Sequence, residues 1–574
     1  MLSVCLNFLY MLLTAYLMGF LALTCIRRFC TGRSPIPNGE LQGMEIDGAA
    51  RYGVLDSADS YCMAGLVALT VYAQVFSLFY KVGLAANIIL LILCASTAVI
   101  FRKELHRELL LARNRSTRGK AAFHIFLFFL FVYGTSRGII HYDTGLYHAQ
   151  SIRWIEEYGI VKGLGNLHCR LAYNSSSFSL SALFSFSFLG VQSYHCVAGF
   201  FAFLLAKVCG EIGTAWKRKK LLLSDFARIT CIYYLLIIFD EMISPASDYF
   251  MVLTVFYIII RFLDLLERKE NSWIPYGLLC LVSVYAMSLK LSAALILLLV
   301  IKPAAMLIRE KNLRGILSFI GLGVLIIAPY LIRNALISGW LVYPFTMVDL
   351  FPVDFKIPKG IADYDAREIQ VWGRGVYDVA RFGEPIAGWF PDWMEGLGTV
   401  DKLSVLAAIL AVFALMIAAV FILIKKKKEM YDWLLVAATV DLSFLFWLFS
   451  APLIRYGCVY VWLAAAVTFG GLSLYMVKSG KVWKVVYMAV GIAACYKALA
   501  FGREIVTAYD GNYFIRQKDY ENFDVIAYEI DGTTFYCPSE GDRTGYEAFP
   551  SSPVRAAMTF RGTDISDGFR YQNN

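Results

Sequence analysis

Charged side chains that could do chemistry stand where long apolar segments of this sequence end, and the first is Asp143 in the segment HYDTGLYH. Asp143 follows a membrane-length apolar run by only a few residues, which predicts that its carboxylate lies at the boundary between membrane and water. A carboxylate placed there can act as a general base that takes the proton from an attacking hydroxyl group. The alternative is that Asp143 only caps the helix that follows it, and the sequence leaves both roles open.

A short helix is predicted directly after Asp143, because aromatic and polar residues recur there with helical spacing. The aromatic face holds Tyr147, Trp154 and Tyr158, and the polar face holds Gln150, Arg153 and Glu157. A helix with these two faces is expected to lie in the plane of the membrane interface, close to the Asp143 carboxylate.

Further charged residues end other apolar segments, with acids early in the chain and cations late. A carboxylate beside a cationic pocket suits transfer of a group from an activated phosphate to a hydroxyl, since arginine and lysine can hold and neutralise the released phosphate. Each residue also has a simpler role as a solvated group at a span end. The candidate catalytic acids are Asp143 and Asp248, and the candidate donor-phosphate or substrate-binding residues are His148, Lys290, Arg333, Asn334, Arg455 and Tyr456. If Asp143 is only a cap, the base is sought at Asp248, Asp349 or Asp354.

The composition identifies the elements that must position these residues as membrane spans. Apolar residues make up 59% of the 574 positions and charged residues only 17%, against about 25% charged in soluble proteins. The net charge of +9 comes from basic runs between the apolar segments, which is the positive-inside pattern and gives no indication of nucleic-acid binding. The 13 cysteines are scattered without a CxxC pair, which argues against both a disulfide framework and a zinc site.

The apolar runs predict an all-α polytopic membrane protein with about fourteen transmembrane helices of roughly 20 residues each. The expected spans lie near residues 4–26, 61–81, 84–101, 121–140, 194–213, 226–243, 249–266, 273–289, 291–308, 316–332, 403–424, 432–449, 457–477 and 485–501. The apolar stretch 178–189 is too short to span, so a re-entrant or interfacial helix is favoured there over a further span.

Basic clusters alternate with these spans and divide the chain into five parts. These parts are N-terminal spans with a basic cytoplasmic loop (1–120), a membrane core (121–332) with a first external loop (141–177), a long external loop (333–402), C-terminal spans (403–501) and an external tail (502–574). In the tail, the segments VIAYEI (525–530) and TTFYC (533–537) are suited to a small β-hairpin.

The order of the charged landmarks resembles the GT-C superfamily of integral-membrane glycosyltransferases. The matching features, over roughly residues 120–500, are HYDTGLYH around Asp143, SPASDYF around Asp248, an RN-x(4)-G-x(3)-YP run from Arg333 to Pro344, and a P-x-x-RY turn at Pro452, Arg455 and Tyr456. The block HYDTGLYHAQSIRWIEEYG also resembles a group of uncharacterised bacterial membrane proteins. The sequence departs from the superfamily in two ways: Asp143 is followed by Thr144 and Gly145 rather than by a second acid, and extra spans precede the one that ends at Asp143.

The resemblance implies an inverting glycosyltransferase of the plasma (inner) membrane with its active site on the extracytoplasmic face. Its partners would be a polyprenyl-phosphate-linked sugar donor, membrane lipid, and an acceptor that is an envelope glycan, a lipid or a protein. Nucleic acid is not among the expected partners. The process would be polysaccharide biosynthesis of the cell envelope. No cofactor is implied with certainty, and a divalent cation held by Asp143 and Asp248 stays open. The competing functions are a transporter or flippase of lipid-linked glycans, which needs charges near the bilayer midplane such as Asp441, and a non-catalytic envelope assembly protein.

Overall fold

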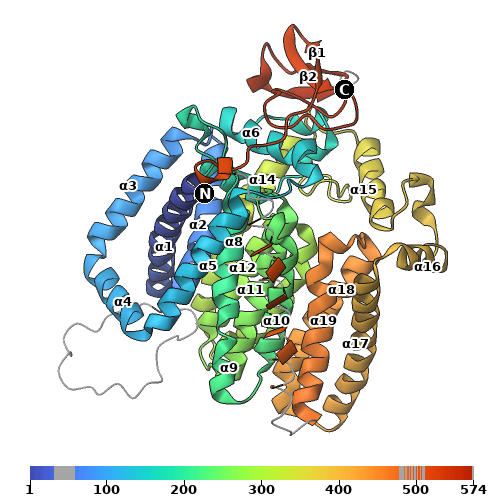
Figure 1. Ribbon diagram of the computed structural model, residues 1–574. Coiled ribbons are helices and arrows are strands. Elements are labelled where there is room, and N and C mark those ends of the chain that lie inside the picture. The colour runs from blue at the N-terminus through green and yellow to red at the C-terminus, as the bar shows by residue number, and fades with distance from the viewer. Residues whose placement is uncertain are drawn as a thin grey trace.

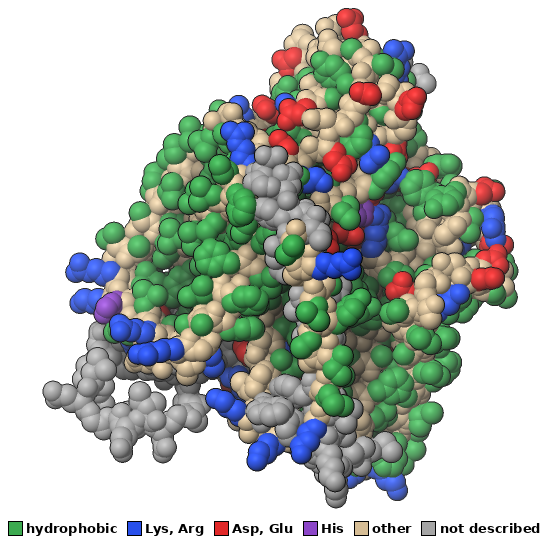
Figure 2. Space-filling view, viewed as in Figure 1, with side chains coloured by type: hydrophobic (Ala, Val, Ile, Leu, Met, Phe, Trp, Pro, Cys, Tyr) green, Lys and Arg blue, Asp and Glu red, His purple; other side chains and the backbone are tan. Residues whose placement is uncertain are grey.

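The computed structural model describes residues 1–31, 58–476 and 511–571, together with scattered helical positions between 484 and 506. Most of this chain is helical, and a small β-domain caps one end of the helix bundle (Figure 1). We call the end of the bundle under the β-domain the site end, because Asp143 and Asp248 lie there, and the opposite end the basic end. Figure 2 shows mainly lysine and arginine side chains at the basic end and a mixture of acidic and basic side chains beneath and on the β-domain.

The long helices are α1 (Leu2–Thr31), α2 (Ala58–Ser77), α3 (Leu84–Ile100), α4 (Arg102–Arg115), α5 (Arg118–Ser136), α8 (Val197–Gly210), α10 (Leu223–Ile237), α11 (Ser247–Glu267), α12 (Trp273–Leu289), α14 (Leu313–Ser338), α15 (Lys359–Gly373), α17 (Thr399–Ile424), α18 (Tyr431–Ser450) and α19 (Ile454–Met476). Shorter helices are η1 (Thr144–His148), α6 (Ala149–Glu157), η2 (Leu164–Asn166), η3 (Cys169–Ala172), α7 (Ser176–Leu183), η4 (Ser187–Leu189), α9 (Gly213–Arg218), η5 (Ile238–Asp240), η6 (Leu291–Val300), α13 (Ile301–Arg309), η7 (Val379–Gly383), α16 (Ile386–Gly396), η8 (Lys428–Met430), η9 (Gly511–Phe514) and η10 (Ile565–Asp567).

Within the described residues, 10 helices are long and apolar enough to cross a membrane, so the chain is a multi-pass membrane protein. Three of the other four predicted spans lie on helices that do not meet this criterion. Helix α3 joins α4 at a bend of 83°, α12 has 17 residues and α10 has 15. The span predicted at 485–501 lies largely outside the described residues. The stretch 178–189 forms α7, of 8 residues, and the turn η4, which agrees with the prediction that it is too short to span.

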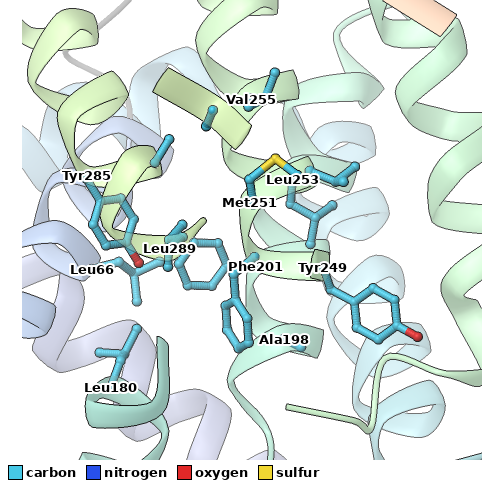
Figure 3. Packing of buried hydrophobic residues seen from close by; sticks show 14 of the residues in the cluster. Leu66, Leu180, Ala198, Phe201, Tyr249, Met251, Leu253, Val255, Tyr285 and Leu289 are labelled. Carbon is cyan, nitrogen blue, oxygen red and sulfur yellow. The ribbon is translucent and has the colours of Figure 1, made fainter. Parts of the chain in front are cut away.

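Helix α11 is the centre of the bundle, because it is apolar around its whole circumference and therefore has to be enclosed. In its apolar 18-residue segment 94% of the residues are buried, and the helix packs against α8, α10, α12 and α19. Figure 3 shows part of this packing, with Met251 and Leu253 of α11, Phe201 of α8, and Tyr285 and Leu289 of α12 among the buried residues. A helix enclosed in this way holds its first turn, and with it Asp248, in a fixed place.

Helices α1 and α2 approach each other closely, because glycines face each other across their contact. A Cβ atom on Gly19 would lie 1.7 Å from the Tyr61 carbonyl oxygen, and one on Gly65 would lie 1.8 Å from the Ala15 carbonyl oxygen. The main chains are thus in direct contact, which fixes the N-terminal helix of the chain against α2.

At the basic end, buried arginines join α2, α10 and α11. Arg228 of α10 donates to both carboxylate oxygens of Asp264 at 2.7 and 2.8 Å, and Arg261 of α11 donates to Asp59 at 2.6 Å. Buried charges persist only when they are paired and hydrogen-bonded. This network therefore holds the helix ends together at the face opposite Asp143.

The β-domain consists of two antiparallel hairpins, β1 (Val525–Ile530) with β2 (Thr533–Pro538), and β3 (Met558–Phe560) with β4 (Phe569–Tyr571). The first hairpin confirms the one predicted from the segments 525–530 and 533–537. Because of these strands, the prediction of an all-α chain is wrong for the tail, although it describes the bundle. The rings of Phe535, Phe560 and Phe569 contact one another inside the domain, and the Phe569 ring lies 6.0 Å from that of Trp154 in α6.

Candidate functional site

The site is assembled from the ends of elements that are distant in the sequence. Asp143 precedes the π-helical turn η1, Asp248 stands in the first turn of α11, and Lys290 follows the last residue of α12. Arg455 and Tyr456 open α19, directly after the turn that ends α18. The structure thus brings together Asp143, Asp248, Lys290, Arg455 and Tyr456 from the residues that the sequence singled out.

Arg455 is the central cation of this cluster. Its Nη2 atom donates to Asp143 Oδ2 at 2.7 Å, and its Nε atom lies 3.9 Å from Asp248 Oδ2. Lys290 Nζ donates to the other oxygen of Asp248, and it lies 3.5 Å from the centre of the Tyr456 ring. Acids and cations therefore alternate along the cluster, and the Tyr456 ring carries a cation on its face.

The Asp143 side chain does not cap the helix that follows it. Asp143 occupies the N-cap position of η1 with helical backbone angles, and no hydrogen bond runs from its carboxylate to the first turn. Its Oδ2 atom accepts from Arg455 instead, while within the described residues no donor is directed at Oδ1. The side chain is 15% exposed, and a bound hydroxyl group would not have to displace a described protein donor from Oδ1.

Two histidines border Asp143, and burial lowers the pKa of each below its ordinary value of 6.5. Burial, followed by the charge of Arg455, lowers the pKa of His141, whose Nε2 atom contacts Arg455 Nη1. Burial lowers the pKa of His148 further, and its ring lies 6.2 Å from the His141 ring. His141 Nδ1 also accepts from the Asp143 backbone N–H at 3.1 Å, so this ring orients the turn that carries Asp143. The sequence placed His148 in the site but gave His141 no role in binding.

Arg333 and Asn334 lie outside this cluster. Arg333 is 2% exposed, and its guanidinium donates to Ser77 Oγ, to Asn174 Oδ1 at 3.2 Å and to the Gly159 carbonyl at 3.3 Å. Asn334 Nδ2 donates to the Leu341 carbonyl at 3.2 Å. These bonds tie α14 to the end of α2 and to the loop after α6. Both residues therefore position helices, and the structure does not bring them to Asp143.

The acids of the long loop are already paired with cations. Asp349 accepts from Lys356 of the same loop, and Asp354 accepts from Arg561 of the β-domain at 2.9 Å. Neither acid is among the contacts of Asp143 or Asp248. Asp354 instead joins the long loop to the β-domain.

The β-domain covers the polar face of α6, a helix that the sequence predicted to lie in the plane of the membrane interface. Gln150 donates to the carbonyls of Gly545 and Ala548 at 2.9 and 2.8 Å, and Arg153 donates to the Tyr546 carbonyl at 2.6 Å. The aromatic side was expected to lie in the membrane interface, but Trp154 is 1% exposed and its ring lies 4.8 Å from the ring of Phe549 in the tail. Both faces of α6 are thus used for packing.

The same domain holds the turn next to Asp143. The carbonyl of Gly145 accepts from the backbone N–H groups of Thr544 and Gly545 at 3.0 and 2.9 Å. The Arg543 guanidinium lies between the rings of Tyr142 and Phe523, at 4.5 and 4.4 Å from their centres. The tail therefore forms one wall of the site, a role that the sequence did not indicate.

Tyrosine rings extend from Asp143 toward the long loop. The Tyr147 and Tyr173 rings lie 5.8 Å apart, and Tyr173 O–H donates to Asp365 of α15 at 2.7 Å. Aromatic faces and carboxylates of this kind are suited to the apolar faces and hydroxyl groups of sugars.

A metal site is not formed among the described residues, where no group of three or more His, Cys, Asp or Glu side chains could hold an ion. Arg455 stands between Asp143 and Asp248, the two acids that the sequence left open as ligands of a divalent cation.

The clearest cavity of the described residues, of 220 Å³, is apolar and lies between α1, α2, α12 and α14. Its lining includes Ala22 and Ser60, near the basic end, so it does not belong to the site.

A family described as a domain of unknown function (DUF8201) matches residues 1–462, which cover α1 to the first half of α19 and all residues of the charged cluster. No curated protein and no solved structure matches the chain.

Proposed function

The chain belongs to the DUF8201 family, and from the geometry of its site we propose that it is a membrane glycosyltransferase of the inverting type, similar to the GT-C superfamily. The observation that carries this proposal is the Asp143 carboxylate, which Arg455 holds by one oxygen at 2.7 Å while the other oxygen stays open. A base of this kind next to a cationic pocket, at a membrane boundary, has the parts that sugar transfer from a lipid phosphate requires.

The donor in this proposal is a sugar linked to polyprenyl phosphate, with its phosphate near Lys290 and Arg455. The acceptor hydroxyl attacks the anomeric carbon on the face opposite the phosphate, and Asp143 Oδ1 takes the hydroxyl proton. A new glycosidic C–O bond forms as the bond from the anomeric carbon to the phosphate oxygen breaks. The electron pair leaves with the polyprenyl phosphate, whose charge Arg455 and Lys290 stabilise.

Asp248 acts as a second acid that holds Lys290 and Arg455 in place. It lies on the most enclosed helix of the bundle and contacts both cations. Tyr456 supports Lys290 through its ring face, and His148 packs against Phe178 behind Asp143, with 5.5 Å between the ring centres. The site functions in this account on the extracytoplasmic face of the plasma membrane, with an envelope glycan, lipid or protein as the acceptor.

The second candidate function is a transporter or flippase of lipid-linked glycans, and the observation in its favour is Asp441. This acid is buried in α18, where Thr468 Oγ1 donates to it at 3.5 Å. An ionisable group inside a span often marks a transport path. A non-catalytic assembly role is the third.

The test is turnover of a polyprenyl-phosphate sugar by the purified protein, with released polyprenyl phosphate and glycosylated acceptor measured together. We expect both products to form in equal amounts, and a parallel reaction with chelator decides whether a divalent cation takes part. Movement of the lipid-linked sugar across a vesicle membrane without release of polyprenyl phosphate would favour the transporter.

A further inference from the structure

Arg170 is a cation close to Asp143 that the proposed reaction has not used. It lies in the short helix η3, in the loop between α6 and α7. Its guanidinium carbon is 4.8 Å from the centre of the Trp372 ring, which belongs to α15. A guanidinium stacked on an indole is held flat, and its N–H donors point outward in the plane of the stack.

The groups around Arg170 do not use these donors. Asp143, Tyr147 and Tyr173 are within electrostatic range of the guanidinium, as are Asp365 and Glu368 of α15. Asp365 Oδ1 accepts from the Tyr173 hydroxyl at 2.7 Å, and Asp365 Oδ2 is buried without a hydrogen-bond partner among the described residues. Over residues 58–476 and 511–571, no hydrogen bond or ion pair to the Arg170 guanidinium is formed, and Trp372 is its observed partner.

The other cations beside Asp143 are in a different situation. Arg455 contacts Asp143 and Asp248, and Lys290 contacts Asp248, so the acids of the cluster already balance both charges. An anionic substrate that binds only there has to compete with these carboxylates. Arg170 lies on the side of Tyr147 and Tyr173 and has no such competitor within ion-pair distance.

The exposure of Arg170 is intermediate, so a ligand can reach a guanidinium that has lost part of its water. No group of the described residues accepts from the guanidinium N–H donors, so an incoming anion can accept from them without displacing a protein partner. The fork of an arginine matches the oxygens of a phosphate or carboxylate, with which it forms short charge-assisted hydrogen bonds.

We propose that Arg170, held by Trp372, forms an anion-binding subsite beside Asp143 that takes a phosphate or carboxylate group of a substrate. The identity of that substrate rests on the proposed function, because the anion is either the donor phosphate or an acidic group of the acceptor. The binding of the anion itself rests only on the geometry of Arg170.

The test is direct binding to the full-length protein purified in detergent, measured by titration calorimetry. The probes are a short-chain polyprenyl monophosphate, which represents the donor phosphate, and glucose 6-phosphate and glucuronate, which represent acidic sugars without a lipid. We expect Arg170→Gln to weaken at least one class of probe by about tenfold or more, as the loss of a charge-assisted hydrogen bond does. Arg170→Lys, which keeps the charge and loses the fork, should fall between wild type and Arg170→Gln.

Arg374→Gln is the matched control. The Arg374 guanidinium lies at the same 4.8 Å from a tryptophan ring, that of Trp389, but it donates to the Phe382 carbonyl at 3.0 Å. Equal melting temperatures of the two variants show that a change in binding is not a change in folding.

The outcomes separate the sources and the two proposals. A loss confined to polyprenyl phosphate assigns the subsite to the donor, and a loss confined to acidic sugars assigns it to the acceptor. Arg170→Gln with wild-type affinity for every probe, or a wild-type protein that binds none of them, overturns the subsite. If binding depends on Arg170 but sugar transfer is not observed, the subsite stands and the glycosyltransferase proposal fails.

Discussion

The two oxygens of the Asp143 carboxylate have different surroundings, and this difference is the basis of the proposed chemistry. Arg455 donates to Oδ2, which orients the carboxylate, and Oδ1 has no donor among the described residues and can accept a proton. The sequence predicted Asp143, Asp248, Lys290 and Arg455 because each is a charge at the end of an apolar run. Arg333 has the same local signature, but its side chain points into the contact between α14 and α2. Only the packing of helices distinguishes these two cases, and a single sequence does not contain it.

At the scale of a residue, Arg455→Lys should keep the positive charge and lose activity. A lysine has one ammonium group and does not serve Asp143, His141 and Asp248 together, as the guanidinium does. We expect kcat/KM for the donor to fall about 10-fold to 100-fold, in line with the loss of one to two charge-assisted hydrogen bonds. The control is Arg137→Lys, since Arg137 pairs with Asp240 at 3.2 Å outside the site. Equal losses in the two variants would contradict a specific role for Arg455.

The turn that carries Asp143 is fixed by the β-domain, and this explains a feature that the sequence left without a reason. A Cβ atom on Gly145 would lie 2.7 Å from the Phe523 ring. Glycine at this position therefore allows the tail to dock. The tail was predicted only as a small hairpin, because its contacts with α6 come from main-chain carbonyls, which have no sequence signature.

At the scale of the element, Gly145→Ala should loosen the β-domain from the bundle. Overpacking of this kind costs about 1–3 kcal/mol. Hydrogen exchange of the Thr544 and Gly545 amides, which donate to Gly145, should become faster. The second change Phe523→Ala should restore part of the protection, and Gly360→Ala, where nothing lies within 4 Å, should have no effect. Unchanged exchange in Gly145→Ala would show that the tail does not hold this turn.

The segment before α8 gives the protein a pH dependence. His195 is buried, its Nδ1 atom lies 2.7 Å from the Ile243 carbonyl oxygen, and burial lowers its pKa from 6.5 to about 4. Below pH 6.5 His195 is protonated in the unfolded chain, whereas in the folded chain it stays neutral until the pH falls to about 4. The contribution of His195 to stability is therefore complete above pH 6.5 and falls by about 1.4 kcal/mol per pH unit as the pH decreases through this window.

Thermal unfolding between pH 7 and pH 4.5 measures this loss. His195→Asn should reduce the slope of the melting temperature against pH, whereas His106→Asn, at an exposed position of α4, should leave the slope as it is. A melting temperature that rises as the pH falls from 6.5 would have the wrong sign for this explanation.

At the scale of the whole molecule, the bundle has one end with mixed charges under the β-domain and one end rich in lysine and arginine (Figure 2). The positive-inside rule predicts that these ends face different compartments, with the basic end in the cytoplasm. The number of spans was harder to predict, because α10 and α12 are apolar but shorter than a full span and α3 bends into α4. Apolar length alone does not distinguish a short enclosed helix from one that crosses the membrane.

Labelling of single cysteines in intact cells tests this orientation. A cysteine at exposed Tyr364 of α15 should react with a membrane-impermeant thiol reagent, and one at Lys427 at the basic end should react only after the membrane is opened. The reverse pattern would place Asp143 on the cytoplasmic face and remove an extracytoplasmic donor.

The measurement that most directly tests the account is sugar transfer by Asp143→Asn. This change keeps the shape of the side chain and removes the charge that accepts the proton, so the rate should fall by about 10²-fold to 10⁴-fold while the protein still folds and binds the donor. Asp240→Asn is the control, because Asp240 also pairs with an arginine at the site end but lies outside the cluster. Near-normal sugar transfer by Asp143→Asn would contradict the proposal that Asp143 is the catalytic base.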